Sequence, residues 1–456
     1  MGKGYALLFE QGCGKTLTAI AIAGRLYLDG KAKKMLVLAP LSVCPVWPKE
    51  MDQYAAFPHT VTALSELGRR GLPLQQKRLR AGTAYDGLDV VVTNYESLRS
   101  KPTYDALTAW DADIIICDES QRIKNWKAAT SKLAQGLGDQ ARYKLILTGT
   151  PVCNTPLDFW SQYRFLDPSV FGKSWWAFQS RYAIKGGYDS KQTIGVRFLG
   201  ELSRKAHTIA SRVRKEDALD LPPYVTETYY CDLEPATRAV YDELRDRGAI
   251  ELYGTQVTAQ QVITRMLRLA QIAGGWLPEE DPPRRISWAK HGLCADIVQD
   301  ILESDPHRKV VVFCRFVSEI KALLADFNRT PQMGGFGEGS TVGIWGDVPG
   351  KERGELVERF QTDPKCRVFV AQTHTAGLGI TLHAADTVIF YSPDFSYADY
   401  AQARDRIHRI GQTRPCTCIH LCARGTIDEL AFAAVEAKKS LADSCVDNWK
   451  IILGKG

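Results

Sequence analysis

The sequence predicts an α/β protein built on parallel sheets, and three observations support this fold class. Apolar runs such as 114–117 have the length of buried strands and end directly in polar residues. Stretches with apolar residues at helical spacing lie between these runs, for example at Ala19, Ile20 and Ala23. A glycine-containing turn at 12–16 joins the first run to its helix. Strands that alternate with helices in this way are typical of parallel sheets.

The turn at 12–16 has the composition of a phosphate-binding loop. It follows an expected strand at 5–9 and opens a helix, and its glycines let backbone N–H groups approach phosphate oxygens. The lysine of such a loop reaches the terminal phosphates, and the hydroxyl after it ligates Mg²⁺. Phe9 stands where the commonest pattern has its first glycine, and Gly-x-Gly-Lys-Thr also occurs by chance in flexible turns. We expect nucleotide contacts from Gly12, Cys13, Gly14, Lys15 and Thr16.

The composition is that of an ordinary globular protein. The 456 residues are 45% hydrophobic and 24% charged, and this length allows about three domains of ~150 residues. No apolar run approaches the ~20 residues of a membrane span, and the N-terminus lacks a signal peptide. The net charge of +6 permits nucleic-acid binding along a local groove without requiring it. The 12 cysteines are scattered, which favours reduced thiols and a cytoplasmic location.

Four potential metal ligands alternate along the chain at Cys416, Cys418, His420 and Cys422. Strict alternation places all four on one face of a strand, with the outer two roughly 20 Å apart. Ligands in one straight row cannot surround a zinc ion at Zn–S distances of ~2.3 Å. We therefore predict a strand face here and no metal site.

Two adjacent carboxylates, Asp118 and Glu119, follow the apolar run at 114–117. Ligands of parallel α/β sheets bind at the carboxyl ends of the strands. Asp118 is therefore expected to hold the same Mg²⁺ as Thr16, and Glu119 to orient or deprotonate an attacking water. Acidic residues are also common at solvated strand ends, so this assignment depends on the phosphate loop upstream. Further buried strands are expected at 33–40, 89–95 and 143–151.

The last third of the chain repeats the strand pattern and adds an arginine-rich segment. Strands are expected at 309–315, 367–372 and 387–391. In the segment 402–412, Gln402 and Arg406 are four residues apart and Arg406 and Arg409 three apart, so a helix would place all three on one face. Two guanidinium groups held in this way suit the charge of a transferring γ-phosphoryl group. The alternative is an exposed basic helix that forms surface salt bridges.

The middle of the chain mixes aromatic and basic residues at helical spacing. This pattern predicts a helical section, which either contacts nucleic acid or only packs with extended cationic side chains. Pro-Glu-Glu-Asp-Pro-Pro at 278–283 is the best candidate for a linker. We expect three parts, namely an α/β lobe at 1–170, a helical insertion with linker at 171–285 and a second α/β lobe at 286–456.

Several strings of residues resemble the motifs of superfamily-two helicases and translocases. GCGKT at 12–16, DESQRIKN at 118–125 and LTGTPVCN at 147–154 look like motifs I, II and III, in that order. DESQRIKN is close to the DEAHRIKN of Swi/Snf-type DNA translocases, with Gln121 in place of the histidine. QARDRIHRIGQ at 402–412 is nearly that family's motif VI. The resemblance extends over almost the whole chain.

The resemblance implies a fold and a set of site residues. The fold is two RecA-like parallel-sheet lobes with a helical insertion between them, and ATP binds in the cleft. The first lobe would supply the catalytic residues Lys15, Asp118 and Glu119, with Thr16 as a further Mg²⁺ ligand. The second lobe would supply Gln402, Arg406 and Arg409, together with Gly379 of motif V for nucleotide binding. By their places in motifs Ia, Ib and V, the residues expected to face DNA are Ser42, Asn94, Thr373 and Thr375.

The resemblance also implies an activity. The implied activity is that of a DNA-dependent ATPase that uses ATP and Mg²⁺ and moves on double-stranded DNA, remodelling DNA or protein–DNA complexes. The alternatives are a strand-separating DNA or RNA helicase, and a nucleotide-gated DNA-binding protein without turnover. We expect a monomer whose partners are double-stranded DNA and other DNA-processing proteins. We expect no appended reader domain, which would favour a short bacterial or phage protein.

Two departures from the family pattern qualify this expectation. Gln121 can donate and accept hydrogen bonds but cannot carry the charge of the family's histidine, which affects the coupling between lobes more than hydrolysis. The family also has an adenine-reading glutamine upstream of motif I, and few residues precede the loop here. We therefore expect weaker ATP binding than in a longer form.

Overall fold

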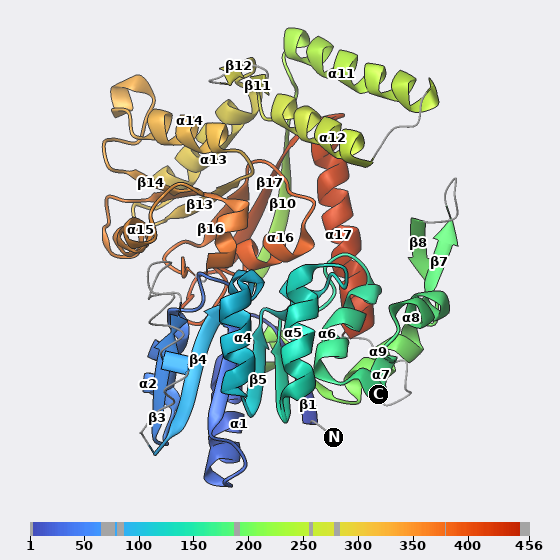
Figure 1. The fold of residues 1–456 in the computed structure, drawn as a ribbon. Coiled ribbons are helices and arrows are strands. Elements are labelled where there is room, and N and C mark those ends of the chain that lie inside the picture. Colours follow the sequence, from blue (N-terminus) through green and yellow to red (C-terminus); the bar gives the residue numbers. More distant parts are fainter. Residues whose placement is uncertain are drawn as a thin grey trace. The chain divides into compact units, whose positions relative to one another are not determined.

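The computed structural model describes residues 3–64, 78–79, 86–186, 192–254, 259–277, 283–378 and 380–446. The chain forms two compact units (Figure 1). The first comprises residues 1–219 and 438–456, and the second residues 220–437. Each unit contains one large sheet in which all strand pairs are parallel, as the sequence predicts.

The first unit is built on a seven-stranded sheet in the order β3-β4-β2-β5-β6-β1-β9. Its strands are β1 (Lys3–Phe9), β2 (Lys34–Ala39), β3 (His59–Ala63), β4 (Leu88–Asn94), β5 (Ile114–Asp118), β6 (Tyr143–Leu147) and β9 (Ala210–Val213). The central strands are buried on both faces, because helices cover both sides of the sheet. A separate antiparallel hairpin joins β7 (Ala183–Gly186) to β8 (Gln192–Val196).

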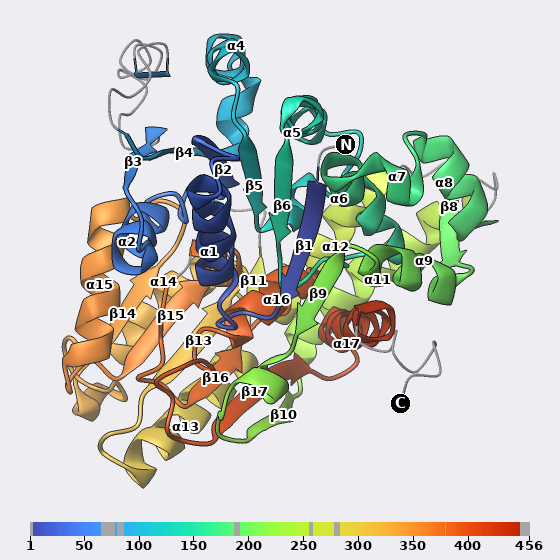
Figure 2. The ribbon, with the colours of Figure 1, turned by 90° about the horizontal axis from the view of Figure 1, so that it is seen from below.

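Helices cover this sheet on two sides (Figure 2). They are α1 (Lys15–Leu28), α2 (Val46–Tyr54), α4 (Lys101–Trp110), α5 (Ala129–Gln140), α6 (Phe159–Leu166), α7 (Pro168–Phe171), α8 (Trp175–Tyr182), α9 (Leu199–His207) and α10 (Lys215–Ala218). The helices α1 and α2 pack on one face, where Ile20 and Trp47 join a core with Val37 and Val92 of the strands. The helical spacing after the phosphate loop therefore reflects the buried face of α1.

The second unit is built on a six-stranded sheet in the order β10-β17-β16-β13-β15-β14. Its strands are β10 (Tyr224–Cys231), β13 (Val310–Cys314), β14 (Thr341–Ile344), β15 (Val368–Gln372), β16 (Thr387–Phe390) and β17 (Cys416–Ala423). A small antiparallel pair is formed by β11 (Trp276–Leu277) and β12 (Arg284–Arg285).

The helices of the second unit cover its sheet and extend away from it. They are α11 (Pro235–Gly254), α12 (Ala259–Ala273), α13 (Ala289–Ser304), α14 (Val317–Phe327), α15 (Gly350–Thr362), α16 (Tyr397–Arg404) and α17 (Ile427–Val446), the last of which ends in residues assigned to the first unit. The core contains Val298 of α13 and Leu323 of α14 against Val312 and Val370. No helix within the described ranges has the length and apolar character needed to span a membrane.

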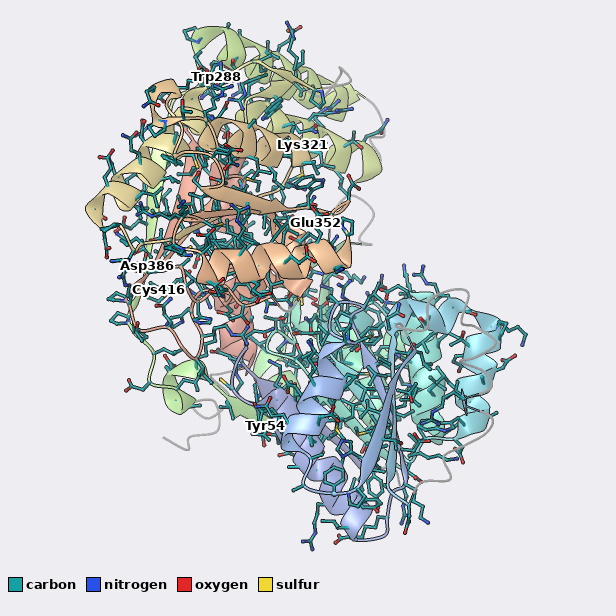
Figure 3. The ribbon with its side chains drawn as sticks, turned by 90° about the vertical axis from the view of Figure 1, so that its left-hand side faces the viewer. Tyr54, Trp288, Lys321, Glu352, Asp386 and Cys416 are labelled. Atoms are coloured by element: carbon teal, nitrogen blue, oxygen red, sulfur yellow. The ribbon has the colours of Figure 1, made fainter. Side chains whose placement is uncertain are left out.

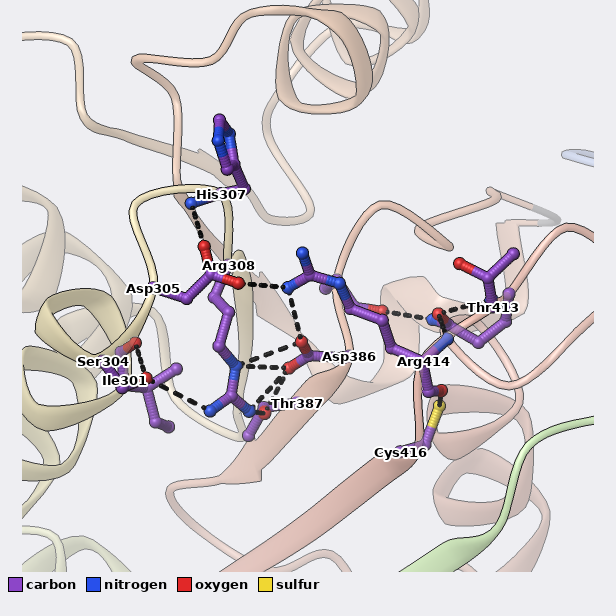
Figure 4. Close-up of polar contacts among 12 residues, drawn as sticks. Ile301, Ser304, Asp305, His307, Arg308, Asp386, Thr387, Thr413, Arg414 and Cys416 are labelled. Carbon is purple, nitrogen blue, oxygen red and sulfur yellow. Dashed lines mark hydrogen bonds and ion pairs between the residues drawn. The ribbon is translucent and has the colours of Figure 1, made fainter.

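Ion pairs tie the amino ends of the strands in the second sheet together (Figure 4). Arg308 precedes β13, and its Nη2 donates to Asp386 Oδ1 at 2.8 Å and to Thr387 Oγ1 at 2.9 Å. Arg414, before β17, lies 3.0 Å from Asp305 and 3.5 Å from Asp386. Asp386 and Cys416, labelled in Figure 3, are both buried where β16 and β17 begin. These contacts fix the edge of the sheet opposite the carboxyl ends of its strands.

The row Cys416, Cys418, His420 and Cys422 lies along β17, and all four side chains are buried. His420 accepts or donates a 2.9 Å hydrogen bond with the Tyr400 hydroxyl and stacks on Phe432. Among the described residues no group of three or more His, Cys, Asp and Glu side chains is placed to hold a metal ion. The predicted strand face is confirmed.

The middle section contains strands that the sequence analysis does not predict. The helices α8, α9, α11 and α12 lie there, but β9 pairs with β1 of the first sheet and β10 pairs with β17 of the second. Both are edge strands. The side chains of β9 are partly buried and most of those of β10 are exposed, so neither strand has an apolar run. β3 was missed for the same reason. Most of the predicted linker at 278–283 lies outside the described residues.

Candidate active site

The phosphate loop connects β1 to α1, as the sequence predicts. β1 ends at Phe9, α1 begins at Lys15, and the intervening backbone turns twice. Gly12 and Gly14 have φ angles of 84° and 79°, a left-handed region where a side chain would be strained. The Cys13 amide donates to the carbonyl of Glu10 at 3.2 Å. The glycines therefore set the shape of the loop.

The side chain of Lys15 folds back over this loop. It is 9% exposed, and its ammonium donates to the carbonyl oxygens of Phe9 at 3.1 Å and Glu10 at 3.2 Å. These carbonyls hold a positive charge at the centre of the loop. An incoming phosphate, which carries a full negative charge, would bind the same ammonium more strongly than neutral carbonyls do.

Asp118 ends β5 and is buried beside the loop. Its Oδ2 accepts from Trp47 Nε1 at 3.0 Å, and its Oδ1 accepts from the Glu119 amide at 2.9 Å. Burial and the neighbouring Glu119 carboxylate raise the pKa of Asp118 to about 7, while Trp47 and Lys15 act in the opposite direction. A cation bound here would favour the charged carboxylate.

Glu119 is oriented by two glutamine amides. Gln11 of the phosphate loop donates to its Oε1 at 2.9 Å, and Gln121 donates to its Oε2 at 2.7 Å. The backbone of Glu119 has a φ of 49°, which turns the chain sharply after β5. Both carboxylate oxygens are therefore fixed next to the loop that holds Lys15.

Gln121 also connects this carboxylate to the next strand of the sheet. The hydroxyl of Thr148, just after β6, donates to Gln121 Oε1 at 2.7 Å and accepts from the Thr150 amide at 3.0 Å. The side-chain amide of Gln121 thus contacts Glu119 through its nitrogen and Thr148 through its oxygen. Sequence reasoning noted Gln121 only as a departure and missed Gln11, because no local pattern signals a contact across 108 residues.

The donors at the loop fit a magnesium ion. A hydroxyl at Thr16 and a carboxylate at Asp118 are hard oxygen donors, which Mg²⁺ prefers. Mg²⁺ commonly takes only one or two protein ligands and completes its shell with water and phosphate oxygens.

The segment of Gln402, Arg406 and Arg409 does not form the predicted continuous helix. α16 ends at Arg404, and the chain continues as a turn in which the Arg406 amide donates to the Ala403 carbonyl at 3.1 Å. The expectation that helical spacing places these three residues on one face is therefore wrong. Only Gln402 lies on the helix, and it is buried.

Tertiary hydrogen bonds cause this early helix end. The Leu382 amide donates to the Arg406 carbonyl at 3.0 Å, so that carbonyl is used outside a helix. The side-chain nitrogen Nε2 of Gln412 donates to the carbonyls of Ala385 at 2.7 Å and Ile407 at 3.2 Å. Arg409 donates to Thr381 Oγ1 at 2.9 Å. The turn at 405–412 is thus fixed against the segment 380–385.

The residues expected to face DNA make hydrogen bonds within their own units. Asn94 Nδ2 donates to Glu96 at 3.1 Å. The buried hydroxyls of Thr373 and Thr375 donate to the carbonyls of Cys314 at 3.2 Å and Gln372 at 2.6 Å. Ser42 is half-buried in the turn after β2, and Gly379 lies outside the described residues. Their DNA and nucleotide contacts stay predictions.

Comparison with known proteins places these features in a family context. The model of the SNF2-related domain matches residues 2–274, and that of the helicase conserved C-terminal domain matches residues 294–411. The mouse DNA annealing helicase and endonuclease ZRANB3 is 29% identical over 97% of this chain and 39% of its own length. The TATA-binding protein-associated factor mot1 of Schizosaccharomyces pombe is 27% identical over 96% of this chain and 25% of its own length. This chain therefore spans well under half of either relative.

Among solved structures, the chain is similar to a SWI2/SNF2 ATPase core of Sulfolobus solfataricus in complex with double-stranded DNA. The identity is 25% and the TM-score 0.42, with 100% of this chain and 90% of that chain covered.

Proposed function

Because the chain belongs to the SNF2-related family, we propose that it is a DNA-dependent ATPase whose turnover drives movement along double-stranded DNA. The observation that carries the proposal is the assembly of Lys15, Asp118 and Glu119 at the carboxyl edge of one parallel sheet. A cation, a buried carboxylate and an oriented carboxylate are the groups that nucleotide hydrolysis requires.

Each group has a distinct role in this proposal. Lys15 binds the terminal phosphates, releasing the loop carbonyls that it contacts in the structure. Glu119 orients the attacking water and accepts its proton, while Gln11 and Gln121 keep the carboxylate in place. Thr16 and Asp118 would hold Mg²⁺, which neutralises charge on the phosphates when it is bound.

The relatives support the proposal that this protein acts on DNA. The mouse relative ZRANB3 is a DNA annealing helicase and endonuclease. We propose that Ser42, Asn94, Thr373 and Thr375 contribute to phosphate contacts, which position a protein on DNA without reading its sequence. The participation of Gln402, Arg406, Arg409 and Gly379 in turnover, a monomeric state and a bacterial or phage cytoplasm remain predictions from the sequence.

An ATPase assay with duplex DNA, single-stranded DNA and RNA in parallel tests this function. We expect stimulation by duplex DNA, and a loss of about 10²–10⁴-fold in Glu119→Gln, the range for removing a general base. A wild-type protein that binds ATP and DNA but shows no turnover would instead support a nucleotide-gated binding protein.

A second assay separates translocation from unwinding. Displacement of a triplex-forming strand reports movement along a duplex, whereas release of a strand from a forked duplex reports unwinding. We expect the first and not the second. Strand release without triplex displacement would favour a strand-separating helicase.

A further inference from the structure

Glu10, the first residue of the phosphate loop, is bonded on two sides. On the loop side its carbonyl accepts from the Cys13 amide at 3.2 Å and from Lys15 Nζ at 3.2 Å. On the other side its amide donates to the Val213 carbonyl at 2.9 Å. Its carboxylate Oε2 accepts from the Lys215 amide at 3.0 Å. Glu10 therefore links the loop to β9 and the start of α10.

Arg212 completes this link from β9. Its Nη2 donates to Glu10 Oε1 at 2.7 Å, and its Nη1 donates to the Leu8 carbonyl at 2.9 Å. The guanidinium side chain is 10% exposed, so water competes little for these charge-assisted bonds. β9 runs parallel to β1 with Arg212 opposite Leu8, which places the guanidinium where β1 turns into the loop. Two hundred residues of chain separate these partners.

We propose that Arg212 is a positioning residue that acts through Glu10 to hold the phosphate loop in its nucleotide-binding shape. This inference rests on the proposed ATPase function and concerns the same loop. The loop turns through two glycines, which do not stiffen the backbone themselves. Without Arg212, the Glu10 carboxylate loses its guanidinium partner on β9 but still accepts from the Lys215 amide. The loop is then less ordered before nucleotide binds, and part of the binding free energy is spent on ordering it.

The expected effect falls on binding more than on the chemical step. Gln11, Gln121 and Trp47 orient the carboxylates of Glu119 and Asp118. The contacts of Arg212 described above are with Glu10 and Leu8. Arg212→Met should therefore weaken nucleotide binding about tenfold, as expected for losing a charge-assisted contact. The kcat at saturating ATP should fall by no more than about threefold, since uniform binding mainly changes KM. Arg212→Lys, which can still reach one acceptor, should recover part of the affinity.

A matched control is available in the same unit. Arg164 also pairs with a carboxylate through two bonds, from Nη1 and Nη2 to Asp139 at 2.7 and 2.8 Å, but joins α6 to α5 away from the loop. Arg164→Met removes a comparable ion pair without touching residues 10–15. It should leave nucleotide affinity unchanged.

The experiment is titration of a fluorescent ATP analogue into the wild-type, Arg212→Met, Arg212→Lys, Arg164→Met, Glu10→Gln and Glu10→Gln/Arg212→Met proteins, with steady-state kinetics in parallel. The double variant should bind no more weakly than Arg212→Met alone, because both changes break the same contact. Equal affinities of the wild-type and Arg212→Met proteins, or an equal loss in Arg164→Met, would overturn the inference. If Arg212→Met does not fold, Glu10→Gln carries the same test. Wild-type protein that binds no nucleotide would contradict the proposed function itself.

Discussion

The phosphate loop of the first unit and the turn at 405–412 of the second are both held by glutamine side chains, but in different ways. In the first unit, Gln11 and Gln121 bind the carboxylate of Glu119, which is itself a candidate catalytic group. In the second unit, the side chain of Gln412 bonds only to backbone groups in the contacts described. Its Nε2 lies near three carbonyls, and its Oε1 accepts from the backbone amides of Thr413 and Arg414. The first arrangement orients a candidate catalytic carboxylate, and the second fixes the backbone conformation of a turn.

Substitution of Lys15 in the first region should abolish nucleotide binding, whereas substitution of Arg406 in the second should lower kcat. These are the largest expected effects. Lys15→Ala should abolish nucleotide binding, because its ammonium is the cation at the centre of the loop. Arg406→Lys should keep nucleotide binding but lower kcat by about 10³-fold, the lower end for removing an arginine that stabilises phosphoryl transfer. Nucleotide titration and kcat measurements on both variants check this. Unchanged turnover in Arg406→Lys would remove that residue from the proposed site.

Gln412→Ala should destabilise the second unit. Truncation leaves buried carbonyls and two amides without their partner, at a cost of about 2–3 kcal/mol. Hydrogen exchange over the segment 380–412 should rise accordingly. The control is Gln299→Ala, which removes an exposed contact with Glu303 on α13 and should change stability by less than about 0.5 kcal/mol. Equal exchange in the two variants would show that the turn does not depend on Gln412.

Gln121→Leu and Gln11→Met should change turnover more than stability. Leucine removes both contacts of Gln121, so we expect kcat to fall about tenfold, whereas methionine removes one donor to Glu119 and should cost about threefold. Steady-state kinetics with thermal unfolding separates the two effects. A loss of stability in proportion to the loss of kcat would mean that these glutamines support the fold and not the carboxylate.

A buried carboxyl in the second unit should make stability depend on pH, and this is the smallest effect. Burial raises the pKa of Glu319 in the second unit to about 7, against the hydrogen bond from Ser392 and the charge of Lys290. A carboxyl whose folded pKa is raised binds its proton more tightly in the folded state, so its stabilisation is complete below about pH 4 and is lost as pH rises through about 7.

Glu319→Gln tests this sign. From pH 5.5 to 8, the wild type should lose about 2 kcal/mol more stability than the variant, since each pKa unit corresponds to about 1.4 kcal/mol and the raised pKa lies about 1.5 units above pH 5.5. Urea unfolding monitored by hydrogen exchange of β13 measures the difference. Identical pH dependence in both proteins would contradict the raised pKa.

The predicted core strands depend on local information and are confirmed. β5 and β13 are continuous apolar runs, because both faces of a parallel sheet are covered by helices. The phosphate loop was predicted for a similar reason, since glycine is required where the backbone takes a left-handed φ. Edge strands such as β9 carry no such run, and so their membership of the sheet could not be predicted.

By itself, the sequence determined the fold class, the central strands, the phosphate loop and the carboxylate pair that ends β5. These features depend on neighbouring residues, through hydrophobic spacing and backbone sterics. Only the tertiary structure decided that α16 ends at Arg404, that two glutamines orient Glu119, and that Arg212 reaches Glu10. Most of these are hydrogen bonds between residues far apart in the chain, and the energy of such a bond depends on how the whole chain brings donor and acceptor together.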